Sequence, residues 1–356
     1  MTTLNTYPFA FKDALYSASA EYFSNSNLKT LSKLNKIYSD TALGGANDTN
    51  NKNYPNKNFI LTKEMVMDLP GAFFNTPLIK FCTETCSRFS TLISSLKREG
   101  QVELSPRETL IFASEVVLKP QYGKDFLGTI AAQKLVDFVS QNNHGTNTIS
   151  VCSDTGFIDE MVALTKRAKD IGQKVVLMTI GGYGFGGGTT EQKKNLNGDS
   201  RDFVLHTIKD SIDYHIQNFQ DQGFSSEVLP LMKTSYRYDK MLELQQSINE
   251  QLKLVMGENV RDISKKVGPL SFDDMVLLID TCEFKAILNT KENNVNNNET
   301  INTLIQKYEN SGVVIAFSGP AGCGKDYWRD RVCESVEEYN QTKKSQEIED
   351  SNSMTR

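Results

Sequence analysis

The stretch Gly319-Pro-Ala-Gly-Cys-Gly-Lys-Asp326 has the spacing G-x-x-x-x-G-K, and it decides how the rest of the sequence is interpreted. It follows a short apolar run at residues 313–317 and precedes a segment with helical character at residues 327–332. A strand, a glycine-rich turn and a helix in this order are the context of a phosphate-binding loop, in which backbone N–H groups at a helix N-terminus surround phosphate oxygens. The sequence therefore predicts a phosphate site here, with a plain glycine-rich turn as the alternative.

The residues of this loop that we expect to contact nucleotide phosphates are Gly319, Ala321, Gly322, Cys323, Gly324, Lys325 and Asp326. Lys325 is expected to be solvent-accessible and to reach the β- and γ-phosphates. Asp326 stands where a Ser or Thr usually follows the lysine, and its carboxylate is a hard oxygen ligand suited to Mg²⁺. The loop ends at residue 326 of 356, so we expect the rest of its domain to lie upstream.

Composition narrows the classes of partner. A net charge of −5 argues against a broad nucleic-acid-binding surface, though not against a local basic pocket. The cysteines, at positions 82, 86, 152, 282, 323 and 333, show no C-x-x-C spacing and are predicted to be buried thiols. No signal peptide opens the sequence and no run approaches the length of a membrane span, so we expect a soluble cytoplasmic protein without a membrane partner.

The middle of the sequence alternates between apolar runs and helical segments. Residues 148–152 are predicted to form a buried strand that ends close to Asp154, residues 159–170 form a charged amphipathic pattern, and residues 174–180 are predicted to form the next buried strand. This alternation predicts a parallel α/β sheet. A glycine-rich run at residues 181–188 then follows a strand's carboxyl end, where open α/β sheets bind ligands, although a plain linker has the same composition.

Two segments are predicted to lie outside the packed core. Residues 289–299 are rich in Asn and are interpreted as a linker within a longer tether at residues 286–310. The last twenty residues are polar, and we expect them to be disordered because they offer little apolar surface to bury.

Four further segments resemble, in a rotated order, the motifs of bacteriophage deoxynucleoside monophosphate kinases. They are Phe9-Ala-Phe-Lys12, Ser105-Pro-Arg-Glu-Thr-Leu110, Ser153-Asp-Thr-Gly-Phe-Ile-Asp-Glu160 and Asp213-Tyr-His-Ile-Gln-Asn218. That family begins with the strand, loop and helix that here come last, and its loop also carries Asp after Lys. One cut and one join restore the family's order, so the resemblance implies a circular permutation, which nearby surface termini tolerate.

The resemblance covers roughly residues 7–235 and 311–335. It implies a P-loop NTPase fold of the nucleoside monophosphate kinase type, with a parallel sheet flanked by helices. The implied divisions are a kinase core at residues 1–235, an added helical connection and Asn-rich linker at 236–310, the P-loop unit at 311–335 and a disordered tail at 336–356.

The resemblance further implies ATP and Mg²⁺ as cofactors and a deoxynucleoside 5′-monophosphate as acceptor. Asp154, at a strand's end, would hold Mg²⁺ together with Asp326, or it is simply the cap of the next helix. Arg107 would grip the acceptor phosphate bidentately and act in catalysis with Lys325 and Asp154, or it is a surface residue of a helix that begins at Ser105.

Other charged residues complete the implied acceptor and lid region. Lys12 is a candidate for the same phosphate, and Glu160 is expected to orient a neighbouring basic group. Lys193, Lys194 and Arg201 follow the glycine-rich run and would form a lid that excludes water. For the lysines and Arg201 a solvated surface is the alternative.

Two positions depart from the family pattern. The Thr that follows the loop Asp in the family is Tyr327 here, and the Arg of its D-x-R-F motif is Gly156. Three functions therefore remain open: a deoxynucleoside monophosphate kinase, a kinase acting on a modified base as nucleotide or within DNA, and a nucleotide-binding pseudo-kinase that serves as an interaction module. A homodimer is left open for each of them.

Overall fold

A computed structural model describes residues 3–9, 59–64, 94, 98, 100–104, 119–141, 147–153, 155, 158–182, 203–221, 239–247, 250, 270–289, 294–319 and 323–354. Its elements are β1 (Asn5–Phe9), β2 (Phe59–Thr62), β3 (Gln101–Leu104), α7 (Lys119–Tyr122), α8 (Phe126–Gln141), β4 (Thr148–Cys152), α9 (Ile158–Asp170), β5 (Lys174–Gly182), α11 (Phe203–Asp221), α14 (Phe272–Thr281), β6 (Cys282–Asn289), α15 (Asn294–Tyr308), β7 (Val313–Ser318) and α16 (Lys325–Met354). The chain divides into two compact units, Met1–Phe11 with Ala131–Arg356, and Lys12–Ile130.

The smaller unit contains a two-stranded antiparallel sheet. In it β2 pairs with β3, so that Phe59 lies opposite Leu104 and Thr62 opposite Gln101. The pairing continues one step further, because the Lys63 N–H donates to the carbonyl oxygen of Gly100 at 2.8 Å.

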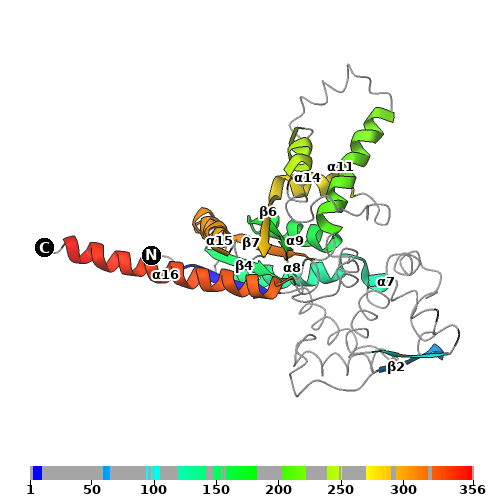
Figure 1. The fold of residues 1–356 in the computed structure, drawn as a ribbon, viewed down its shortest axis with the longest axis horizontal. Helices are drawn as coiled ribbons and strands as arrows, with labels where there is room; N and C mark the ends of the chain where they lie inside the picture. The colour runs from blue at the N-terminus through cyan, green and yellow to red at the C-terminus, as the bar shows by residue number, and fades with distance from the viewer. Residues whose placement is uncertain are drawn as a thin grey trace. The chain divides into compact units, whose positions relative to one another are not determined.

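The larger unit is built on a five-stranded parallel sheet with the order β1-β4-β7-β5-β6 (Figure 1). Helices flank this sheet, so the predicted α/β class with a parallel sheet is confirmed. The last strand in sequence, β7, lies between β4 and β5, with Ile149 opposite Val313 and Val175 opposite Val314. The strand before the glycine-rich loop therefore lies directly beside the strand that ends near Asp154.

Helices α15 and α16 cover one face of this sheet. Phe317 of β7 belongs to the same buried cluster as Leu304 of α15 and Trp328 of α16. The alternate residues Val314 and Ala316 are also fully buried, so both faces of β7 are covered. Burial on both faces explains why the strand is a continuous apolar run rather than an alternating one.

The connections place a second set of helices on the other face. The chain passes from β4 through α9 to β5 in one direction along the sheet and returns from β6 through α15 to β7 in the opposite direction. Parallel crossovers are almost always right-handed, so α9 and α15 lie on opposite faces. Helix α9 packs against β5, and α14 packs against α9 and β6.

The Asn-rich segment differs from its predicted role as a linker. Most of it lies in α15, whose residues Ile301, Leu304 and Ile305 are buried in the core at the i, i+3, i+4 spacing of an apolar helix face. The Asn297 side chain is buried and donates to the carbonyl oxygen of Leu288 at 2.8 Å. The high Asn content made the short apolar stripe of α15 hard to recognise in the sequence. The end of β6, which was also predicted to belong to the tether, is part of a strand of the sheet.

Side-chain contacts also attach α15 to β6. Lys307 and Tyr308 both donate hydrogen bonds to Glu283 Oε2, at 2.7 and 2.9 Å. Burial raises the pKa of Glu283, but hydrogen bonds from Lys307, Lys285 and Tyr308 outweigh it and lower that pKa to about 2. The carboxylate is therefore charged at neutral pH and links the helix to the strand.

Replacing Ile305 by alanine tests whether α15 belongs to the core. The side chain is 0% exposed, so its truncation is expected to lower the free energy of unfolding by about 2–5 kcal/mol. Val295 on the same helix is 76% exposed, and Val295→Ala is expected to change that free energy by less than about 0.5 kcal/mol. Urea denaturation of both variants is the measurement, and equal effects would restore the interpretation of this segment as a linker.

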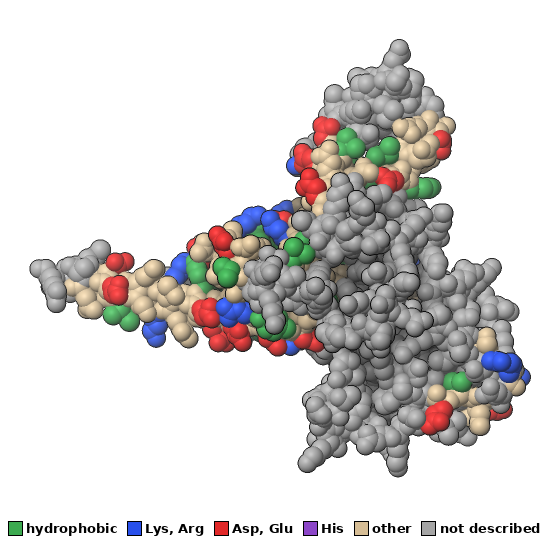
Figure 2. Space-filling model, viewed as in Figure 1, with side chains coloured by type: hydrophobic (Ala, Val, Ile, Leu, Met, Phe, Trp, Pro, Cys, Tyr) green, Lys and Arg blue, Asp and Glu red, His purple; other side chains and the backbone are tan. Residues whose placement is uncertain are grey.

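The C-terminal segment also differs from the expected disorder, because α16 continues to Met354. Trp328, Val332 and Val336 fix its first turns in the core, so the later turns extend a helix that needs no new nucleation. Figure 2 shows both acidic and basic side chains over α15 and α16. Arg331 of α16 pairs with Glu334 and Glu338.

Within the part of the chain that the structure describes, no helix is long and apolar enough to cross a membrane.

Candidate functional site at the loop between β7 and α16

The glycine-rich loop lies at the carboxyl end of the central strand β7. The chain passes from β4 to α9 on one face of the sheet and from β7 to α16 on the other face, so the direction of the connections reverses between these two neighbouring strands. In open α/β sheets, ligands bind outside the carboxyl ends of the strands at such a reversal. The loop leads directly into α16, whose first-turn N–H groups and dipole favour an anion.

Two glycines of the loop have backbone conformations that other residues rarely adopt. The φ angle is +152° at Gly319 and +93° at Gly324. A Cβ atom on Gly319 would lie 2.8 Å from Cys323 Sγ and 3.1 Å from the carbonyl oxygen of Ile180. The loop thus folds back on its own start and against β5, and only glycine fits at its first position.

Lys325 extends back across this loop. Its Nζ donates to the carbonyl oxygen of Gly319 at 2.9 Å and lies 3.9 Å from Cys323 Sγ. The residue is only 9% exposed, so the expectation of a solvent-accessible lysine is wrong. The reason is that the loop encloses its own ammonium group, which puts a buried positive charge beside the backbone that would surround a phosphate.

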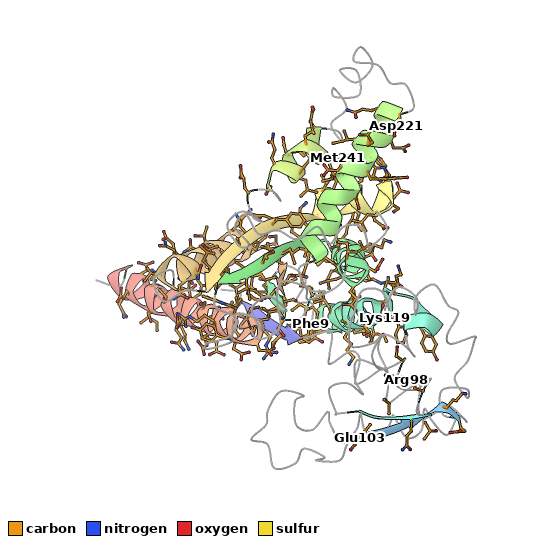
Figure 3. The ribbon with its side chains drawn as sticks, turned by 45° about the vertical axis from the view of Figure 1, so that its right-hand side comes forward. Phe9, Arg98, Glu103, Lys119, Asp221 and Met241 are labelled. Atoms are coloured by element: carbon orange, nitrogen blue, oxygen red, sulfur yellow. The ribbon has the colours of Figure 1, made fainter. Side chains whose placement is uncertain are left out.

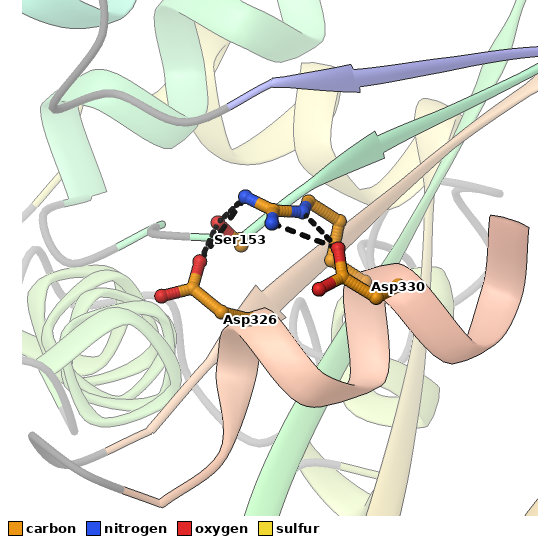
Figure 4. A network of polar contacts seen from close by, with 4 residues as sticks. Ser153, Asp326 and Asp330 are labelled. Carbon is orange, nitrogen blue, oxygen red and sulfur yellow. Dashed lines mark hydrogen bonds and ion pairs between the residues drawn. The ribbon is translucent and has the colours of Figure 1, made fainter. Parts of the chain in front are cut away.

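Asp326 is the first acidic residue of α16 and connects the loop to β4. Ser153, which directly follows β4, donates from its Oγ to Asp326 Oδ1 at 2.8 Å. Arg329 Nη1 lies 3.2 Å from the same oxygen and 3.4 Å from Ser153 Oγ (Figure 4). Asp330 accepts from Arg329 Nε at 2.9 Å on the other side of the guanidinium.

Backbone contacts link the carboxyl ends of three neighbouring strands. The Ser153 N–H donates to the carbonyl oxygen of Phe9, the last residue of β1, at 3.0 Å. Figure 3 labels Phe9 at the end of this strand. The N–H and Oγ1 of Thr155 both donate to the carbonyl oxygen of Phe317, at 3.2 and 2.8 Å. The segment after β4 is thereby held against the end of β7, where the phosphate loop begins.

The structure brings together some of the residues that the sequence singled out. Gly319, Cys323, Gly324, Lys325 and Asp326 form the described part of the loop. Outside the described residues lie Lys12, Arg107, Asp154, Lys193, Lys194, Arg201, Ala321 and Gly322.

Glu160 lies in the first turn of α9 and is 3% exposed. An acidic residue there interacts favourably with the helix dipole. Its expected role in orienting a basic group stays a prediction.

Sequence reasoning missed Ser153, Arg329 and Trp328. Asp326 and Arg329 are three residues apart on a helix, and that spacing alone signals a side-chain pair. Ser153 could not be found in this way, because its partner Asp326 is distant in the sequence. Trp328 is 1% exposed and anchors the first turn of α16, and its backbone N–H donates to the carbonyl oxygen of Gly324 at 3.0 Å.

Among the described residues, no three His, Cys, Asp or Glu side chains lie close enough together to bind a metal ion by themselves. A nucleotide-bound Mg²⁺ needs less protein, because phosphate oxygens and water supply most of its ligands. Asp326, with its side chain 52% exposed beside the loop, is suited to that smaller role.

Comparison of the chain with protein-family models, curated proteins and solved structures gives no match.

Proposed function

We propose that the chain is a P-loop nucleotide kinase that transfers the γ-phosphate of ATP to a deoxynucleoside 5′-monophosphate. The observation that carries this proposal is the loop from Gly319 to Lys325. It joins the central strand of a parallel sheet to the N-terminus of a long helix and encloses a buried lysine. Such a loop supplies backbone donors, a helix dipole and a fixed cation to bound phosphates.

Strand order supports the proposal that the fold is a circularly permuted kinase core. Numbered from β7, as the proposed original order requires, the strands of the sheet run 2-3-1-4-5. The loop strand is then both the first and the central one, as in a doubly wound sheet where the chain starts in the middle and fills each side in turn.

The chain ends also support this permutation. In the proposed original order α16 would lead directly into β1, so the two should be neighbours. Asn340 of α16 accepts from the Leu4 N–H at 3.0 Å and donates to the Leu4 carbonyl oxygen at 2.9 Å. A short connection between residue 340 and residue 4 could therefore replace the present termini.

Phosphoryl transfer depends mainly on positioning and charge neutralisation. Lys325 and the loop N–H groups would bind the β- and γ-phosphates, and Asp326 with Asp154 would hold Mg²⁺, which neutralises charge on the phosphates. We propose that Arg107 and Lys12 bind the acceptor phosphate, and that Lys193, Lys194 and Arg201 close over it, with Glu160 orienting a basic group.

A nucleotide-binding module without transfer is the second candidate function. It is favoured by Tyr327, which is 56% exposed in the first turn of α16. The kinase family carries Thr at this position, with its hydroxyl group close to the metal. Both functions require ATP at the loop, and they differ only in turnover.

Binding at the loop can be measured through Trp328, the only tryptophan of the chain. Because this buried side chain lies in the first turn of α16, we expect MgATP to change its fluorescence and adenosine to leave it unchanged. Transfer to each deoxynucleoside monophosphate would be followed as ADP release, with a modified-base nucleotide included. No response to millimolar MgATP by folded protein contradicts the proposal, and binding without any transfer selects the second candidate.

A further inference from the structure

We propose that Ser153 and Arg329 are positioning residues that orient the Asp326 carboxylate toward the divalent cation of a bound nucleotide. This role rests on the proposed function. It concerns the network in Figure 4, which joins the helix after the loop to the segment after β4.

The geometry concentrates two donors on one carboxylate oxygen. Ser153 Oγ and Arg329 Nη1 both approach Asp326 Oδ1, at 2.8 and 3.2 Å. Ser153 is 1% exposed, whereas the Asp326 side chain is 52% exposed. The carboxylate is therefore held from the protein side and presented to solvent next to Lys325.

The guanidinium is itself fixed from its far side. Asp330 Oδ1 lies 2.9 Å from Arg329 Nε and 2.8 Å from Nη2. Two such contacts orient a planar guanidinium better than they would a lysine ammonium, which is a point charge on a flexible chain. Arg329 thus acts as a rigid spacer between the two carboxylates.

The sum of charges favours a cation here over a second phosphate. Within the network, Asp326 and Asp330 carry two formal negative charges and Arg329 one positive charge, which leaves −1, while the positive charge of Lys325 is held inside the loop at the carbonyl oxygen of Gly319. A phosphate bound directly by Arg329 would be repelled by both carboxylates, while a divalent cation beside Asp326 would be attracted. A carboxylate that is oriented by hydrogen bonds before binding has a higher affinity for a divalent cation.

Stability alone is a weak reason for this arrangement. Exposed i,i+3 ion pairs such as Asp326 with Arg329 stabilise a fold very little. Arg331 on the same helix makes equivalent pairs with Glu334 and Glu338, and its side chain is 24% exposed against 21% for Arg329. Arg331 therefore provides a matched control, because its partners are Asn298, Glu334 and Glu338 rather than Asp326 or Ser153.

The test compares ATP affinity with excess Mg²⁺ and with EDTA, measured by Trp328 fluorescence. In the wild-type protein we expect Mg²⁺ to tighten ATP binding. Ser153→Ala and Arg329→Gln are each expected to reduce this Mg²⁺-dependent gain by about 10–100-fold and to leave the affinity in EDTA unchanged. Arg329→Lys should restore part of the gain, and Arg331→Gln should change neither value.

A double-mutant cycle keeps the proposal falsifiable if one variant is poorly folded. Asp326→Asn should lose the gain by itself, and Asp326→Asn combined with Arg329→Gln should lose no more. Additive losses, or an Arg329→Gln variant whose ATP affinity falls as much in EDTA as in excess Mg²⁺, would overturn the positioning role. If the wild-type protein binds ATP equally well with and without Mg²⁺, this inference is wrong but the proposed function stands. If the folded wild-type protein binds no ATP, the proposed function is wrong as well.

Discussion

Replacing Lys325 by alanine is expected to lower the rate of phosphoryl transfer by about 10²–10³-fold. The ammonium group is the only cationic side chain in the described part of the loop, where its Nζ donates to the carbonyl oxygen of Gly319 at 2.9 Å. Charge that develops on the transferred phosphoryl group would meet this fixed, desolvated cation, which needs no reorganisation during the reaction. Steady-state ADP release with a responsive acceptor is the measurement.

The same substitution also removes a structural contact, so stability has to be measured beside activity. Loss of one hydrogen bond from a charged donor costs about 1.5–3 kcal/mol, which should leave the protein folded at 25 °C. Lys344→Ala is the control, because Lys344 is an exposed residue on the same helix. Lys325→Arg should not restore activity, since a planar guanidinium does not reproduce the compact ammonium that donates to the carbonyl oxygen of Gly319. Turnover within about threefold of wild type would contradict the assignment of the loop.

Much of the sheet could be predicted from sequence patterns that lie within single elements. The apolar runs at β4, β5 and β7 are buried on both faces, so composition alone reveals them. Helix α9 has an amphipathic pattern with charges on its exposed side, and its predicted bounds agree closely with Ile158–Asp170. These patterns lie within single stretches of the sequence, so each element can be predicted without knowing which other elements it packs against.

Features that depend on tertiary partners were harder to predict. In α15 the apolar stripe at Ile301, Leu304 and Ile305 is short, and its Asn-rich flank suggested a linker. The contact of Ser153 with Asp326 joins residues that only the sheet brings together. The enclosure of Lys325 likewise follows from loop geometry, since Gly319, Cys323 and β5 must pack before the ammonium is covered.

Replacing Gly319 by alanine is expected to damage both stability and nucleotide binding. The φ angle of +152° is strained for any residue with a Cβ atom, which costs of order 1–3 kcal/mol. The new methyl group would also lie 2.8 Å from Cys323 Sγ and 3.1 Å from the Ile180 carbonyl oxygen, so the loop or the end of β5 has to shift. A displaced Gly319 carbonyl would in turn lose its hydrogen bond from Lys325.

Two further variants separate the backbone strain of Gly319→Ala from its steric overlap. Gly172 follows α9 with a φ angle of +71°, and a Cβ atom there would meet nothing within 4 Å, so Gly172→Ala carries only the backbone cost of about 1–2 kcal/mol. Adding Cys323→Ala to Gly319→Ala removes the 2.8 Å overlap but keeps the one with Ile180, and should recover part of the lost stability.

Urea denaturation should therefore rank Gly319→Ala as least stable and the double variant as intermediate, because strain and overlap add at Gly319 and only strain acts at Gly172. Trp328 titration should show weakened MgATP binding in both Gly319 variants and normal binding in Gly172→Ala. If Gly319→Ala were no less stable than Gly172→Ala and bound MgATP normally, close packing at the start of the loop would not be what shapes the phosphate site.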